Sequence, residues 1–164
     1  MAKTDLTAQR VRELFYVNQS GALIRAIRGT GGRSQVGREA GSIDASGYIE
    51  VSIDGSAYKA HRIVWLHIHG VWPQGQIDHI NGDRRDNRPG NLRDVPAFIN
   101  CENQRFGRSD SSHGLLGVCY FKGKWQAQIT VRGKQRYLGR FSSAEDAHAA
   151  YLDAKRILHA GCTI

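Results

Sequence analysis

Hydrophobic residues in the N-terminal part of the chain follow two periods, one typical of helices and one typical of strands. Residues 6–15 repeat apolar side chains at helical spacing and predict a helix. Residues 16–27 predict two short strands around a Ser-Gly turn, and residues 47–62 alternate about a central Asp-Gly, the strongest short signal for a β-hairpin. The apolar run within 61–70 predicts a buried helix that ends at its final glycine. The Gly-rich polar segment 29–41 predicts a loop.

The middle of the chain has a weaker pattern that is rich in Asn, Asp and Arg. The sequence QIDHING predicts a short strand that ends in an Asn-Gly turn. After a polar loop, residues 94–105 predict a short helix, because Asp94 can cap its start and Pro96 suits its first turn. In that helix Asn100 and Asn103 are three positions apart and would share a face.

The last third of the chain returns to alternation. Three segments, 116–121, 125–131 and 135–141, predict strands joined by tight turns at Lys-Gly-Lys and Arg-Gly-Lys. A helix from Ser143 through Leu158 follows, with a serine at its start and acidic residues in its first turn. A sheet this small needs the helix packed against it to be stable.

These elements predict an α+β fold organised in four parts. Residues 1–60 form a β-rich N-terminal region, 61–106 a central core, 107–114 a flexible polar linker, and 115–164 a three-stranded antiparallel sheet packed on one helix. With 164 residues, 40% of them hydrophobic, the chain is long enough for one ordinary domain or two small ones.

Composition indicates the cellular location of the protein and the kinds of stabilising site that it lacks. No apolar run approaches the ~20 residues that span a bilayer, and the N-terminus lacks the apolar stretch of a signal peptide. The three cysteines are widely spaced and odd in number, so the sequence predicts neither a structural zinc site nor a disulfide framework. We therefore expect a cytoplasmic protein without a membrane partner.

Charge indicates a polyanionic partner and the end of the chain that binds it. The formal net charge is +8. Residues 114–164 hold 8 Lys and Arg against 3 Asp and Glu, whereas residues 61–113 hold 7 against 6. A bias concentrated at one end is more typical of a binding surface than of general solubility. The C-terminal third is therefore the expected nucleic-acid anchor.

One group of polar residues carries candidate chemistry. Asp78 and His79 are adjacent, and Asn91 and Asn100 follow His79 by 12 and 21 positions. On a strand the first two point to opposite faces, so they suit two different tasks. A carboxylate and an amide oxygen, here from Asp78 and Asn100, are hard donors that suit Mg²⁺ or Mn²⁺. His79 can take a proton from water near neutral pH, with its other nitrogen held by Asn91 or by a backbone carbonyl that Asn91 positions.

The run IDHINGDRRDNRPGNLR followed by INCEN resembles the His-Asn-His (HNH) endonuclease motif, in the variant whose third histidine is an asparagine. The resemblance covers roughly residues 45–105 and implies a ββα-metal (His-Me finger) nuclease core. It implies Asp78 and Asn100 as ligands of one divalent metal ion, Mg²⁺ or Mn²⁺, with His79 as general base. It also implies Asn91 as the amide that fixes the histidine-bearing loop. No small-molecule cofactor besides the metal is expected.

Three further positions belong to this resemblance. The segment AHRIVW is similar to the one that precedes the motif in phage- and intron-encoded homing endonucleases, and it implies Arg62 as a support for the phosphate. Asn103, at the end of the motif, is a second supporting candidate. Pro96 departs from the pattern, because relatives often carry Ser or Thr there as the cap of the metal-bearing helix. A helix start shifted towards Asp94 would move Asn100 away from the metal.

The C-terminal segment resembles a second family. The sequence GVCYFKGKWQAQITVRGKQRYLGRFSSAEDAHAAY is similar to the Apetala/ethylene-response-factor DNA-binding domain, in which a three-stranded antiparallel sheet lies in the major groove. In WQAQITVR every second residue is apolar, so one face would pack on the helix and the polar face would be available to DNA. Matching positions place on that face Cys119, Phe121, Lys124, Gln128, Thr130, Gln135 and Tyr137. The residues expected to contact DNA are Lys124, Gln126, Gln128, Thr130, Arg132, Gln135, Arg136 and Tyr137.

Two functions fit this sequence. The first is a divalent-metal-dependent HNH DNA endonuclease, which could be a nickase, tethered to double-stranded DNA by its C-terminal sheet and located with DNA in a bacterial or phage-infected cell. The second is a non-catalytic, sequence-specific DNA-binding protein on a nuclease scaffold, and the departure at Pro96 keeps it open. An RNA-directed module is disfavoured, because no aromatic RNA-binding sheet motif occurs. Whether the protein is a monomer, which would nick, or a dimer, which could cut both strands, is open.

Overall fold

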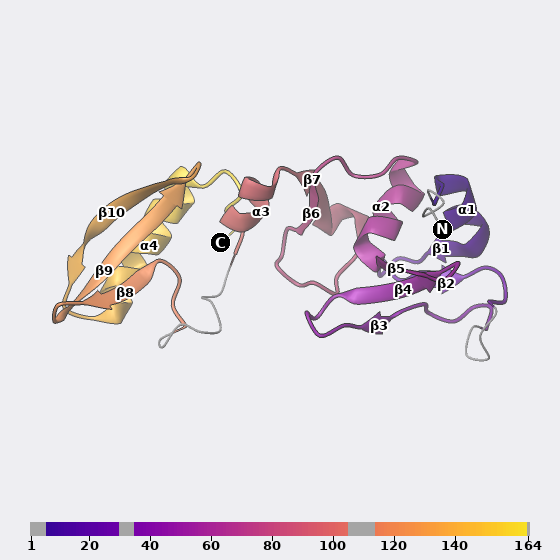
Figure 1. The fold of residues 1–164 in the computed structure, drawn as a ribbon, viewed down its shortest axis with the longest axis horizontal. Coiled ribbons are helices and arrows are strands. Elements are labelled where there is room, and N and C mark those ends of the chain that lie inside the picture. Colours follow the sequence, from indigo (N-terminus) through magenta and orange to yellow (C-terminus); the bar gives the residue numbers. More distant parts are fainter. Residues whose placement is uncertain (1–5, 30–34, 105–113, 164) are drawn as a thin grey trace. The chain divides into compact units, whose positions relative to one another are not determined.

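The computed structural model describes residues 6–29, 35–104 and 114–163 and divides the chain into two compact units, Met1–Val95 and Pro96–Ile164 (Figure 1). Both units combine helices with small antiparallel sheets, which confirms a mixed α and β fold. The unit boundary falls inside the segment that the sequence predicted as one core. Most of the expected linker, 107–113, lies outside the described residues. Within the described ranges, no helix has the length and apolar character needed to cross a membrane.

In the first unit, two helices and two small sheets precede the strand that carries the candidate site. In chain order its elements are α1 (Ala8–Leu14), β1 (Phe15–Val17), β2 (Leu23–Arg25), β3 (Ser42–Ile43), β4 (Ile49–Ile53), β5 (Ser56–Lys59), α2 (Ala60–His69), β6 (Gln76–His79), the 3-10 turn η1 (Pro89–Asn91) and β7 (Leu92–Val95). The sheets are β1-β2, β3-β4-β5 and β6-β7, and all of the strand pairs are antiparallel. The predicted N-terminal helix and both predicted hairpins are therefore confirmed, whereas β3 directly follows the expected loop of residues 29–41, at positions where the sequence predicted no element.

Local signals explain where these elements begin and end. The Thr7 hydroxyl accepts from the Arg10 backbone N–H at 3.2 Å and caps α1. The β4–β5 turn has positive φ at both Asp54 and Gly55, 47° and 79°, as the Asp-Gly pattern requires for a two-residue hairpin. Gly70 ends α2 in the left-handed conformation.

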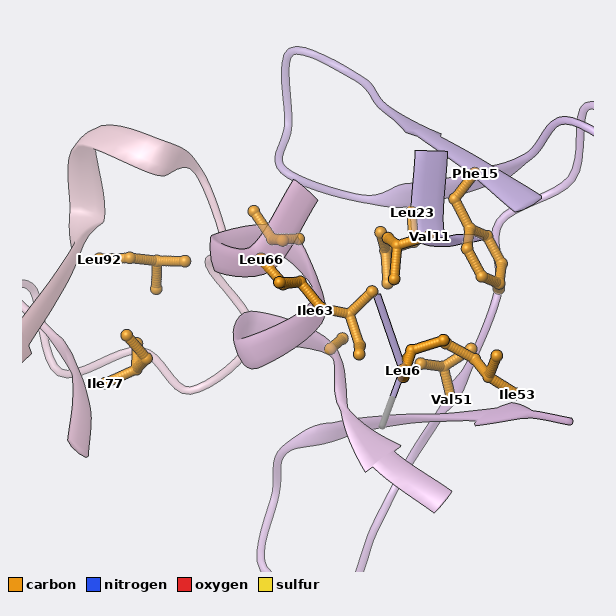
Figure 2. Close-up of a cluster of buried hydrophobic side chains, with 13 residues drawn as sticks. Leu6, Val11, Phe15, Leu23, Val51, Ile53, Ile63, Leu66, Ile77 and Leu92 are labelled. Carbon is orange, nitrogen blue, oxygen red and sulfur yellow. The ribbon is translucent and has the colours of Figure 1, made fainter. Parts of the chain in front are cut away.

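Helix α2 supplies the centre of the core of the first unit. In Figure 2 the side chains of Ile63 and Leu66 lie between Val11 on one side and the pair Ile77 and Leu92 on the other. The pair comes from β6 and β7, so the strand that carries the candidate site packs on the same helix as the N-terminal elements. Every one of these five side chains is buried. The core thus fixes the site-bearing ribbon by apolar burial.

The second unit contains a short helix followed by the predicted sheet and its helix. Its elements are α3 (Ala97–Glu102), β8 (Val118–Phe121), β9 (Lys124–Val131), β10 (Lys134–Phe141) and α4 (Ala144–Leu158). The sheet order is β10-β9-β8, and α4 packs against one face of it (Figure 1). Ser143 caps α4 by accepting from the backbone N–H of Asp146 at 3.1 Å. The predicted sheet, its turns and its capped helix are therefore confirmed.

The helix predicted over 94–105 is shorter than expected and starts differently. Asp94 does not cap it: the Asp94 carboxylate accepts from the backbone N–H groups of Gln74 and Gly75, both at 2.8 Å. Residues 94 and 95 belong to β7, because the residue before a proline is driven towards extended backbone. Pro96 takes the N-cap position rather than the first turn, so this helix starts at Ala97 without an accepting side chain at its cap.

The C-terminal end of the chain holds α3 within the second unit. The Glu102 carboxylate is buried and accepts from the backbone N–H of Gly161 at 3.2 Å. The buried ammonium of Lys155 donates to the carbonyl of Gln104. These contacts connect the C-terminal end of α3 to α4 and to the residues after α4. Helix α3 is therefore part of the C-terminal structure rather than an independent segment.

Candidate active site

Asp78 and His79 lie side by side on β6, and each is only 4% exposed. Across the β6–β7 ribbon Asp78 pairs with Arg93 and His79 pairs with Leu92. Successive strand residues point to opposite faces, so the carboxylate and the imidazole lie on different sides of the ribbon. This arrangement allows the two groups to do different chemical work.

The imidazole of His79 is held by Asn87, a residue that sequence reasoning missed. His79 Nε2 and Asn87 Oδ1 are 3.0 Å apart, and Asn87 is only 2% exposed. An amide oxygen can only accept, so Nε2 carries the proton in this contact. The one sequence signal for Asn87 was its place in an Asn-rich run, and nothing in its spacing distinguishes it from Asn81.

Asn91 was expected either to hold the second nitrogen of His79 or to fix the histidine-bearing loop, and its contacts join several points of the loop of residues 80–91. Its amide oxygen accepts from the backbone N–H of Asn81 at 2.9 Å. Its amide nitrogen donates to the Asn81 side chain at 3.0 Å and to the Asp86 carbonyl at 2.7 Å. Its own carbonyl accepts from the backbone N–H of Ile80 at 2.9 Å, which closes the base of the loop. Asn91 thus fixes the loop, while Asn87 contacts the ring.

Asp86 adds an ionic tie to the same loop. Its carboxylate accepts from Arg88 at 2.6 and 2.8 Å and from the Asn81 amide at 2.7 Å. Hydrogen bonding to the Arg88 guanidinium is the main reason that the pKa of Asp86 falls to about 2. Asp86 is therefore ionised at neutral pH, and the 80–91 loop is held by a network of polar contacts.

Two aromatic rings lie beside the His79 side chain. The His61 ring meets His79 edge-on with ring centroids 5.1 Å apart, and the Tyr48 ring lies 5.2 Å from His61. The Arg84 guanidinium covers Tyr48 at 5.0 Å. Burial and then the neighbouring His79 lower the pKa of His61 to about 3, so His61 is neutral at pH 7. The His61 ring that meets His79 is therefore uncharged.

The Asp78 carboxylate has a cationic neighbour. Arg93 donates to Asp78 Oδ2 from Nε at 2.8 Å and from Nη2 at 2.7 Å. Within the described parts of the chain, no cluster of three or more His, Cys, Asp or Glu could hold a metal ion. One carboxylate completed by amide, water and phosphate oxygens is a hard-oxygen donor set, which fits Mg²⁺ or Mn²⁺. The residues present are thus compatible with the metal expected from the sequence.

The second expected metal ligand, Asn100, lies in α3 of the second unit. The pair Asp78 and Asn100 therefore comes from two units, and their joint coordination of a metal stays a prediction. Asn103, expected as a supporting residue, is the buried C-cap of α3 and accepts from the Thr163 hydroxyl at 2.5 Å. This contact gives Asn103 a role in attaching α3 to the end of the chain.

Arg62, the other supporting candidate, lies on α2 directly after His61. Its guanidinium carbon is 5.6 Å from the centre of the Trp72 ring, a distance at which a cation is attracted to an aromatic face. The stacked position restrains the long side chain. Its contact with a phosphate stays a prediction.

The sheet of the second unit has a polar face turned away from α4. Ala127 and Ile129 of β9 are buried beneath α4, so the residues that alternate with them point the other way. We call this surface the outer face. Strand register assigns to it Cys119, Phe121, Lys124, Gln126, Gln128, Thr130, Gln135, Tyr137 and Arg140. Except for Arg140, these are positions that the sequence assigned to the polar side of the sheet.

Two of the expected DNA contacts lie elsewhere on the sheet. Arg136 pairs with Ile129 and therefore belongs to the α4 side of β10. Arg132 forms part of the β9–β10 turn, where its φ is 49°. Alternation along WQAQITVR placed Arg132 on the polar face, but β9 ends at Val131 and Arg132 turns away from the strand. Arg136 was also expected to contact DNA, but its register puts it on the other face.

A β-bulge explains why Arg140 was missed. The register shifts by one residue between Tyr137 and Gly139, which brings Arg140 opposite Gln126. With its amide oxygen turned towards Arg140, Gln126 accepts from the guanidinium at 3.0 and 3.1 Å. Strict alternation would have placed Arg140 on the α4 side. The bulge therefore adds a cation to the outer face.

Comparison with known proteins identifies the central segment. Residues 58–100 match the family model described as HNH endonuclease, and they run from β5 through β6 and β7 into α3. No curated protein and no solved structure matches the chain. The family match ends before the C-terminal sheet, whose resemblance to the Apetala/ethylene-response-factor domain stays a prediction. The chain therefore carries an HNH endonuclease domain around Asp78 and His79, and it is a nuclease that hydrolyses DNA phosphodiester bonds.

Proposed function

We propose that this nuclease is a divalent-metal-dependent endonuclease that acts on double-stranded DNA, with His79 as its general base. The observation that carries the proposal is the buried hydrogen bond between His79 Nε2 and Asn87 Oδ1, 3.0 Å long, beside the Asp78 carboxylate. A ring held in this way presents one fixed basic nitrogen. A general base needs both a defined tautomer and a fixed direction.

His79 Nδ1 would take a proton from the attacking water. The water oxygen then bonds to phosphorus while the bond from phosphorus to the leaving oxygen breaks. Asn87 Oδ1, which accepts from Nε2–H, stabilises the positive charge that the ring gains in this step. The neutral His61 beside the ring adds no opposing charge.

The metal ion would be held by Asp78 and Asn100. When bound, Mg²⁺ or Mn²⁺ offsets negative charge on the phosphate and the leaving oxygen. Arg93, which donates to Asp78 Oδ2 from two nitrogens, orients that carboxylate. Asn91 maintains the 80–91 loop, and Arg62 contributes a nearby positive charge.

The outer face of the C-terminal sheet would hold duplex DNA. It combines the cations Lys124 and Arg140 with the amides of Gln126 and Gln128, which are groups able to contact phosphates and base edges. Residues 114–164 carry a net charge of +5, which favours a polyanion. Because one site cuts one strand, nicked DNA is the expected product of a monomer.

Incubation of supercoiled plasmid with the protein tests this proposal. Nicked circles should form with Mg²⁺ or Mn²⁺ and should not form with a chelator. The His79→Ala variant should lose about 10²–10⁴-fold in cleavage rate, while its affinity for duplex DNA stays within about twofold of the wild type. Equal loss of cleavage and binding would contradict the assignment of His79 as base. Cleavage that survives the chelator would contradict metal dependence.

A further inference from the structure

The turn of the β1–β2 hairpin packs directly against the loop that carries Asn87. Gly21, at the tip of this turn, is buried and has φ +78°. A Cβ atom at Gly21 would lie 2.2 Å from the carbonyl carbon and 2.4 Å from the oxygen of Asn87, and 2.3 Å from the nitrogen of Arg88. These are backbone atoms, so no side-chain rotation can relieve the overlap. The hairpin tip and the peptide bond between Asn87 and Arg88 are thus in close contact.

The hairpin side of this contact is held firmly. Asn18 Oδ1 accepts from the backbone N–H and the hydroxyl of Ser20, at 3.0 and 2.7 Å, and from the backbone N–H of Ala22 at 2.9 Å. The Gly21 N–H also donates to the Asn18 carbonyl at 3.0 Å. Below the turn, Phe15 is part of the buried core. The hydrogen bonds within the turn and the burial of Phe15 in the core therefore oppose a displacement of Gly21.

The loop side of the contact has room to move. A cavity of about 220 Å³ adjoins it, and its wall includes Ala22, Ala40, Ala60, Arg85 and Asn87. The cavity offers space into which the backbone at Asn87 can be displaced, while the contacts of Asn91 and Asp86 hold the rest of the loop. A push from the hairpin would displace Asn87, and Asn87 holds the His79 ring through its amide.

We propose that Gly21 is a positioning residue for the nuclease reaction: the hairpin tip sets the place of Asn87, and Asn87 sets the direction of the His79 ring. This inference rests on the proposed role of His79 as general base. It assigns a function to the N-terminal hairpin, which lies outside the segment matched to the HNH family. A misplacement of about 1 Å in such an arrangement can cost about 10²-fold in rate.

The test compares Gly21→Ala with Gly55→Ala in the full-length protein. Both glycines have nearly the same φ, +78° and +79°, so both variants place alanine in the same strained backbone conformation. Among the described residues, a Cβ at Gly55 would have nothing within 4 Å. Gly21→Ala should lower kcat about 10–100-fold with KM and duplex affinity within about twofold, whereas Gly55→Ala should leave all three within about twofold.

A spectroscopic signal separates positioning from general destabilisation. The ring ¹H–¹⁵N signals of His79, assigned by their absence in His79→Ala, should shift in Gly21→Ala and stay in place in Gly55→Ala. In an Asn87→Ala background, Gly21→Ala should cause little further loss of kcat, because both act on one contact. Should Gly21→Ala fail to fold, Asn18→Ala, which loosens the turn without adding an atom, takes its place in the same comparison, with a smaller fall in kcat expected.

Equal kcat values and unchanged His79 signals in the two glycine variants would overturn the inference while leaving the proposed function intact. Independent, additive losses from Gly21→Ala and Asn87→Ala would overturn it as well. Full cleavage by His79→Ala would instead overturn the proposed function itself, so the two failures can be told apart.

Discussion

The 80–91 loop and the outer face of the C-terminal sheet reach their shapes in different ways. In the loop, individual polar side chains fix the structure: Asn91 and Asp86 tie the backbone, and Asn87 holds the His79 ring. On the outer face, strand register alone arranges the side chains, while Ala127 and Ile129 on the other side are buried under α4. A single substitution should therefore be severe in the loop and graded on the sheet, where several groups would share the proposed binding of DNA.

The largest effect is expected from deletion of residues 114–164. Removal of Lys155 and Gly161 would strip α3 of the contacts that hold Gln104 and Glu102, so the deletion should abolish cleavage as well as weaken binding. The deletion also removes 8 Lys and Arg, so the dependence of affinity on salt concentration should become less steep. Plasmid cleavage and duplex binding by anisotropy at several salt concentrations measure both. A truncated chain that cleaves at the wild-type rate would show that α3 needs no C-terminal support.

The next effect concerns a single amide in the loop. Asn87→Ala should lower kcat about 10–100-fold, because the His79 ring loses the acceptor that fixes its tautomer and direction. Asn87→Asp keeps an accepting oxygen at that position and should recover part of the loss. Single-turnover cleavage with saturating enzyme isolates the chemical step. Equal activity of the alanine variant and the wild type would remove Asn87 from the mechanism.

On the outer face the expected effect is smaller and falls on binding. Arg140→Ala should weaken duplex binding by about 5–10-fold and reduce the salt slope by about 1, with kcat unchanged. Arg136→Ala is the matched control, because it removes the same charge from the same strand on the α4 side. Anisotropy titrations at three salt concentrations compare the two. Equal losses would mean that charge alone, and not the face of the sheet, determines DNA binding.

The smallest effect is a pH dependence of stability that comes from His61. Its folded-state pKa of about 3 lies below the ordinary value of 6.5, so between these values the unfolded chain binds more protons than the folded one. Above pH 6.5 protonation of His61 costs the folded protein no stability. As the pH falls from 6.5 towards 3, the free energy of unfolding decreases, by at most about 1.4 kcal/mol per pH unit. The difference in unfolding free energy between wild type and His61→Phe should therefore change with pH. Urea unfolding at pH 7, 6 and 5 measures it, and parallel pH profiles would contradict a buried neutral His61.

The sequence alone determined the features that depend on neighbours along the chain. Alternation and turn residues predicted the Asp54-Gly55 hairpin, and helical spacing with a terminal glycine predicted α2. Alternation also predicted which side of β9 is polar, because side chains on a strand change face at every residue. The spacing of Asp78 and His79 with the later asparagines indicated the nuclease motif, and the family match at residues 58–100 supports it.

Only the tertiary structure decided which groups meet across longer distances. Asn87 contacts His79 because the 80–91 loop folds back on β6, and Gly21 contacts Asn87 because a hairpin far away in sequence packs on that loop. Arg140 reached the outer face through a bulge, and Asp94 bonded to a turn twenty residues earlier rather than to the helix after it. Periodicity reports the local path of the backbone, whereas these contacts depend on how separate elements are packed, and that is set by the burial of the core as a whole.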